Sequence, residues 1–189
     1  MAILKIARMG HPVLARAAQP VPDPTAPEVR RLVADMVETM EDASGTGLAA
    51  PQVHVPLRVV VFFVDGERRR REDADAQGSE AAAGVPLTVM INPAIEPLGP
   101  EKDLGWEACL SVPDLMGQVP RWRRIRYRFQ DLEGRQHERL AEGFHARVVQ
   151  HECDHLAGVL YPQRLADPKT LIFASEAHHL ASAQEAPVA

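Results

Sequence analysis

The sequence predicts an α+β fold in which antiparallel strands pack around a central helix that carries an HExxH motif. Three observations favour this fold class. Segments with strand character gather in the middle of the chain, an apolar helical segment follows them, and an amphipathic helical segment precedes them. We therefore expect an N-terminal amphipathic helix, antiparallel strands, the central helix and a C-terminal helix, in that order.

Composition narrows the class of protein. With 189 residues and 46% hydrophobic content, the chain can bury about 70% of its unfolded surface, so we expect 1–189 to form one domain. The net charge of −5 argues against direct nucleic-acid binding. Two cysteines cannot form a disulfide framework, and no apolar run approaches the roughly 20 residues of a membrane span. Without a leader-like start, we expect no membrane contact and a cytoplasmic location.

The first expected helix is amphipathic. Apolar residues recur at helical spacing from Val29 to Met40, which predicts that this stripe faces the core. Thr25 and Glu28 have the spacing of a capping box, so we expect the helix to begin there. It should end near the glycine-rich segment 45–47.

Two buried strands are expected next. Apolar and β-branched residues predict them over 58–64 and 87–91, and Asn92-Pro93 should close the second. Segment 66–84 between them mixes four arginines with acids and then turns rich in Ala and Gly. This composition predicts a flexible, solvated loop, and we assign it no function.

The second half of the chain begins with a half-buried strand. Ile125, Tyr127 and Phe129 alternate with arginines, which places the arginines on the solvent face. Residues 131–134 should turn the chain back. Helical periodicity then predicts the central helix over 144–156.

The chain is expected to close with a further helix. Gly158 is well placed to cap the central helix, and Asp167-Pro168 should open the last one. Its apolar face would contain Leu171, Ile172 and Leu180. Residues 182–189 should form a loose tail.

The strongest chemical signal is the run His151-Glu152-Cys153-Asp154-His155. With eight histidines in the chain, only about 0.03 HExxH matches are expected by chance. Residues four apart lie on one helix face, so His151 and His155 can reach one metal ion. Glu152, about 100° round the helix, can reach a water at that ion without being a ligand. Two histidines that merely pack are the alternative, but burying them without a metal is costly.

The other two residues of the run are Cys153 and Asp154. Cys153 lies about 200° from His151 on the helical wheel, so it should face away from the metal as a small buried hydrophobe. Asp154 could orient a ligand or form a surface pair, and the sequence does not decide between them.

A catalytic site needs a third protein ligand and an open position. The candidates are Cys109 and the carboxylates. Cys109 lies in a short apolar segment between Gly105 and Pro113, and its thiolate would suit Fe(II) or Zn(II). A buried packing cysteine is the alternative.

A glycine-rich segment precedes both the Cys109 segment and the HExxH run in the sequence. In 45–52, Gly45 and Gly47 permit close approaches that a Cβ would forbid, and Gln52 offers an amide donor. The segment lacks the spacing of a phosphate-binding loop, and a simple turn at a helix end is the alternative.

Taken in order, three motifs resemble those of the peptide deformylase family. They are GTGLAAPQ at 45–52, EACLSVP at 107–113 and QHECDHLAG at 150–158, and the opening ILKIARMGHPVL is also similar. The resemblance implies that Cys109, His151 and His155 bind one divalent metal ion. Fe(II) is the expected ion, with Zn(II), Ni(II) or Co(II) as substitutes.

The resemblance also implies an activity. The enzyme would remove the N-formyl group from the N-terminal methionine of newly made polypeptides and release formate. Glu152 would manage the proton of the attacking water and then protonate the leaving amine. The Gln52 amide and the Leu110 backbone N–H would stabilise the oxyanion. Its partners would be N-formylmethionyl nascent peptides, with a transient ribosome contact as a further expectation.

Substrate contacts follow from the same resemblance. The backbone around Thr46 and Gly47 would pair with the extended peptide, and Glu107 is included among the substrate-binding residues. Phe144 and Val148 share a helical stripe with the two histidines, so they are candidates for the wall of a methionine pocket. The alternative is that both belong to the ordinary core.

One position departs from the family pattern, which has Gly where this chain has Ala108. A positive φ at this position would strain the alanine, and its methyl group could crowd the substrate. Two other functions therefore stay open: action on a different N-acyl group, and binding of peptide N-termini with weak turnover.

Overall fold

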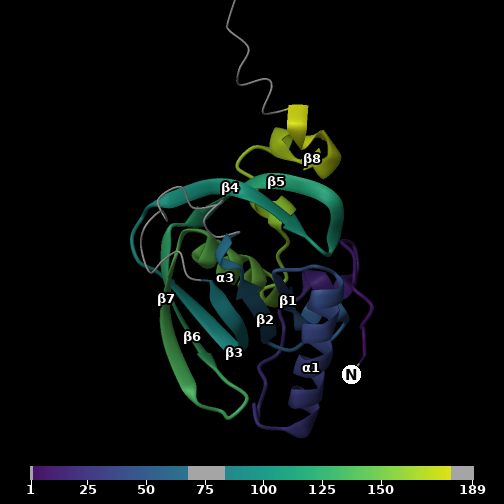
Figure 1. Ribbon diagram of the computed structural model, residues 1–189, viewed down its shortest axis with the longest axis vertical. Helices are drawn as coiled ribbons and strands as arrows, with labels where there is room; N and C mark the ends of the chain where they lie inside the picture. Colours follow the sequence, from purple (N-terminus) through teal and green to yellow (C-terminus); the bar gives the residue numbers. More distant parts are fainter. Residues whose placement is uncertain (1, 68–83, 180–189) are drawn as a thin grey trace, which may run out of the picture.

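A computed structural model, describing residues 2–67 and 84–179, has the expected α+β class (Figure 1). Its strands form two antiparallel sheets, one of five strands and one of three. Helix α3 (Gly143–Leu156) contacts strands of both sheets, and helix α1 (Pro27–Asp42) packs beside β1 and β2. Within the described ranges, no helix has the length and apolar character needed to cross a membrane.

The N-terminal helix is where the apolar stripe predicts it, but its cap is different. Val29, Val33, Met36 and Met40 are buried on one face of α1. The expected capping box is wrong, because Ala26 occupies the N-cap and the Thr25 hydroxyl donates to Asp23 instead. Pro27 begins the helix, where its missing N–H costs nothing.

The larger sheet has the strand order β1-β2-β3-β6-β7, with every neighbouring pair antiparallel. β1 therefore lies at one edge of this sheet. The strands are β1 Gly47–Ala49, β2 Val59–Val64, β3 Val85–Pro97, β6 Arg124–Gln130 and β7 Gln136–Glu142. Strand β6 buries Ile125, Tyr127 and Phe129, as its alternation predicts.

Strand β3 is longer than expected, because Asn92-Pro93 does not close it. The register shifts between Ile91 and Ala94, so the proline lies in an irregularity where no ladder N–H is required. Asn92 adopts φ 52°, and its side chain binds both the N–H and the C=O of Val21. Asn92 and Pro93, which were expected to end the strand, instead lie in a bulge within β3.

The smaller sheet contains β4 (Lys102–Cys109), β5 (Val112–Trp122) and β8 (Ile172–Phe173), in that order. The C-terminal helix does not begin at Asp167-Pro168 as expected. Residues 168–176 form two short 3-10 turns with β8 between them, and helical residues begin at Ala177. Ile172 pairs with Met116 of β5, so sheet pairing replaces the helix here.

Helix α3 lies between the two sheets, under the arch of β4 and β5 in Figure 1. Ala146, Val149 and Leu156 are fully buried along it. The helix ends as predicted, with Gly158 at φ 75° just beyond the C-cap. A Cβ at Gly158 would lie 2.8 Å from the Arg16 nitrogen, so glycine is required for space as well as for conformation.

Three expectations concern residues outside the described ranges. The flexible loop predicted over 66–84 falls there for residues 68–83, as do Leu180 and the loose tail predicted over 182–189.

Candidate metal centre

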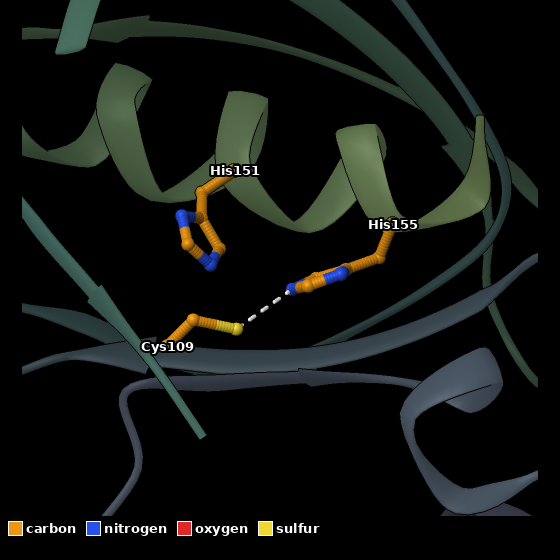
Figure 2. A group of neighbouring side chains, drawn as sticks. All are labelled: Cys109, His151 and His155. Atoms are coloured by element: carbon orange, nitrogen blue, oxygen red, sulfur yellow. Dashed lines mark hydrogen bonds between the residues drawn. The ribbon is translucent and has the colours of Figure 1, made fainter. Parts of the chain in front are cut away.

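Cys109, His151 and His155 meet between α3 and the end of β4. Both imidazoles project from α3 toward the thiol, as Figure 2 shows. The Cys109 Sγ lies 3.4 Å from His155 Nε2, and the ligand atoms of all three residues lie within 4.8 Å of one another. Within the described part of the chain, no other group of three His, Cys, Asp or Glu side chains has this geometry.

The donor set fits a divalent transition metal. Metal–sulfur and metal–nitrogen distances near 2.3 and 2.1 Å in tetrahedral geometry place sulfur and nitrogen about 3.6 Å apart. The observed separation of 3.4 Å between Cys109 Sγ and His155 Nε2 is close to that value. Three protein ligands leave one position for substrate or water, which is typical of a catalytic rather than a structural site.

Glu107 forms a hydrogen bond with His151, the first of the two histidines. Its Oε2 lies 2.8 Å from His151 Nδ1, and this contact fixes the ring so that Nε2 is left for a metal. Arg121 donates two hydrogen bonds to the same carboxylate, and Arg147 donates a third. Burial alone would raise the pKa of Glu107, but the hydrogen bonds from Arg121 and His151 lower it far below its ordinary value. Its carboxylate binds these protein partners, and Glu107 also lines the cavity described below, so its expected contact with substrate stays a prediction.

The ion pairs around Glu107 continue through Arg121 to Asp154 on α3. Arg121 also binds Asp154, and Arg164 binds the same aspartate from the surface. Asp154, for which the sequence allowed a ligand-orienting role or a surface pair, thus lies three contacts from His151, through Arg121 and Glu107. Cys153 packs against the core, where burial raises its pKa to about 12, as expected of an inert thiol.

Glu152 is buried beside the two histidines. Burial raises its pKa to about 7, and its Oε2 has no hydrogen-bond partner among the described residues. The backbone of Gly47 in β1 lies directly against it, and a Cβ at that position would overlap the carboxylate. The glycine-rich segment is therefore more than a helix-ending turn, because it makes room for Glu152.

Gln52 lies beside Cys109 at this centre. Its Oε1 accepts from the Ala49 N–H at 2.9 Å, so its amide nitrogen points toward Cys109. That nitrogen lies 3.2 Å from Ser111 Oγ and 3.5 Å from Cys109 Sγ. Since the side chain is only 2% exposed, its orientation is fixed.

A cavity of about 420 Å³ opens onto these groups. Every predicted site residue except His155 lines it, and His155 lies buried behind the others. Those that line it are Thr46, Gly47, Gln52, Glu107, Cys109, Leu110, Phe144, Val148, His151 and Glu152.

Ala108 also lines the cavity, in an exposed position on β4. Its φ is not among the positive values of the described chain, so the strain considered for an alanine here is absent. Its place on the cavity wall keeps crowding of the substrate by the methyl group as a prediction.

Sequence reasoning missed Arg121 and Arg147. Arg147 lines the cavity and is 9% exposed, on a helix that also buries the apolar residues Val148 and Val149. A charged residue four positions before His151, and so on the same face, was the available signal. The strand carbonyls and the carboxylate that it binds could not be inferred from spacing.

Comparison with known proteins gives a consistent result. The model of the polypeptide deformylase family matches residues 3–171. A protein named peptide deformylase 1 from Bordetella pertussis is 54% identical over 162 residues, covering 86% of this chain and 87% of that protein. The Met-Ala-Ser-bound structure of a class I type b peptide deformylase from Acinetobacter baumannii is 34% identical, with a TM-score of 0.74, and covers 86% of this chain and 98% of that one.

Proposed function

The chain belongs to the peptide deformylase family and removes the N-formyl group from nascent polypeptides, and from this premise we propose which residues carry out the hydrolysis. Peptide deformylases are metalloenzymes, and the chain has a fitting Cys/His/His group. We assign metal binding to Cys109, His151 and His155, with α3 as the central metal-binding helix. The 3.4 Å separation between Cys109 Sγ and His155 Nε2, in a site with an open side, carries this proposal.

Fe(II) is the proposed ion, with Zn(II), Ni(II) or Co(II) as substitutes. When bound, a divalent ion polarises the formyl carbonyl and activates the attacking water. One thiolate and two imidazoles suit each of these ions, so the donor set by itself does not rank them.

Glu152 is the proposed proton carrier. It would take a proton from the attacking water and deliver it to the departing amine, so that water adds across the C–N bond and yields formate and a free N-terminus. The unpartnered Oε2, buried beside the two histidines on the cavity wall, supports this role.

Gln52 and Leu110 are the proposed oxyanion donors. The Ala49 N–H orients the Gln52 amide so that its nitrogen faces Cys109. Leu110 follows Cys109 directly and lines the same cavity. Donors held in this way need no rearrangement when the negative charge develops.

The peptide is proposed to bind as an added strand at the sheet edge that includes Thr46 and Gly47. β1 lies at the edge of its sheet, and β4 lies at the edge of the other, with the cavity lined by both. Phe144 and Val148 would contact the methionine side chain. In this proposal residues 1–189 form one catalytic domain that acts in the cytoplasm on N-formylmethionyl nascent peptides, with a transient ribosome contact.

Formate release from formyl-Met-Ala-Ser tests these roles. The protein would be purified anaerobically and loaded with Fe(II) or Ni(II), with acetyl-Met-Ala-Ser as the second substrate and Glu152→Ala as the control variant. We expect rapid formate release that Glu152→Ala abolishes while metal is retained. Full activity of Glu152→Ala would refute the proton-carrier role, and preferential cleavage of the acetyl peptide would favour a different acyl specificity.

A further inference from the structure

Arg147 is a buried arginine on α3, one turn before His151. Its guanidinium donates to the backbone oxygens of Asp103 and Val119 at 2.8 Å and to that of Gly105 at 3.3 Å. It also donates to Glu107 Oε1 at 2.9 Å. One side chain of the helix thus satisfies acceptors on both β4 and β5.

Gly105 makes room for this guanidinium. A Cβ at that position would lie 2.7 Å from Arg147 Nη2 and 2.8 Å from Cζ, closer than real Cβ atoms approach other heavy atoms. Gly105 lies inside β4, where a glycine normally weakens a strand. Close approach of another group is one reason for a glycine at such a position, and here that group is the Arg147 head.

The three proposed metal ligands come from two elements. His151 and His155 are on α3, whereas Cys109 is the last residue of β4. The separation between sulfur and imidazole therefore depends on how β4 lies against the helix. Arg147 ties the helix to Asp103, Gly105 and Glu107, which occupy alternate positions along β4 toward Cys109.

We propose that Arg147, seated against Gly105, is a positioning residue that fixes β4 on α3 and thereby sets the place of Cys109 relative to the two histidines. This inference rests on the proposed metal centre. The role differs from that of Glu107, which orients the His151 ring. Arg147 acts on the strand carbonyls, where lysine cannot reproduce the planar fork of donors.

Co(II) binding is the test, measured as affinity and as the absorption spectrum of the Co(II)-loaded protein. Arg147→Met is expected to weaken Co(II) binding about 10- to 100-fold, as changes behind metal ligands typically do, and to alter the thiolate-dependent bands. Arg147→Lys should fall between wild type and Arg147→Met. Arg123→Met is the matched control, because Arg123 is 43% exposed and approaches Asp103 only at 3.9 Å; it should bind Co(II) as wild type does.

A double-mutant cycle with Gly105→Ala keeps the inference testable if Arg147→Met folds poorly. Gly105→Ala should weaken Co(II) binding strongly in the wild-type background and much less in Arg147→Lys or Arg147→Met, because the displaced head is then smaller or absent. Equal effects in all backgrounds, or unchanged Co(II) affinity and spectrum in Arg147→Met despite lower thermal stability, would overturn the positioning role. A wild-type protein that binds no Co(II) would refute the metal centre itself, and the inference with it.

Discussion

Replacing Gly47 by alanine should slow catalysis without emptying the metal site. A Cβ at this position would lie 2.6 Å from Cδ and 2.9 Å from Cγ of Glu152. Ordinary contacts between carbons are about 3.5–4.0 Å, so the carboxylate or β1 must move by about 1 Å. A displacement of that size at a reacting group costs about 100-fold in rate. We therefore expect kcat of Gly47→Ala to fall about 100-fold.

The measurement is formate release from formyl-Met-Ala-Ser by protein whose metal content has been determined. Gly45→Ala is the matched control, because the atom nearest its Cβ would be the end of the Leu110 side chain, at 3.0 Å, with Gly47 O and Met40 Cγ farther away at 3.4 Å. That flexible group can move, so the loss in Gly45→Ala should be smaller. Wild-type kcat in Gly47→Ala, or a loss that follows metal content alone, would refute the argument that Gly47 places Glu152.

Three further predictions concern other parts of the chain. Gln52→Leu should lose about 10²- to 10³-fold in kcat with full metal content; a parallel loss of metal would contradict the oxyanion role. Ala108→Gly should raise the turnover of formyl-Met peptides, since the methyl group lines the cavity; unchanged kinetics would show that the methyl group is harmless. Gly158→Ala should lower the free energy of unfolding by more than about 1 kcal/mol in urea titration, because φ is 75° and Arg16 backbone lies in the way; wild-type stability would show that the helix end relaxes.

Local sequence patterns predicted much of the fold. The stripe of α1, strands β2 and β6, helix α3 and its Gly158 cap each depend on neighbours within a few residues. The expected end of β3 and start of the last helix failed for a shared reason. A bulge and a pairing with Met116 are contacts with distant segments, and such contacts override local preference.

The candidate site divides in the same way. His151, Glu152 and His155 could be predicted as a group because helix geometry alone brings them together. Cys109 was one candidate for the third ligand, and only the family resemblance assigned it to the same site, because nothing in its own segment shows that β4 ends at α3. The partners of the arginines that bind Glu107 were not predictable, because they lie 14 to 44 residues away in the sequence.

The ion-pair network of Glu107, Arg121 and Asp154 limits which substitutions this protein can accept during evolution. Arg121 is 5% exposed and Glu107 4%, so the loss of Arg121 alone would remove two hydrogen bonds from a buried carboxylate that would keep Arg147 and His151 as partners. Such single losses typically cost about 3–5 kcal/mol, whereas replacing all members by apolar residues together can be neutral. Relatives in which position 121 is not basic should therefore also differ at 107 or 154. Correlated substitutions at positions 107, 121 and 154 among relatives would therefore show that these residues act together behind the metal centre.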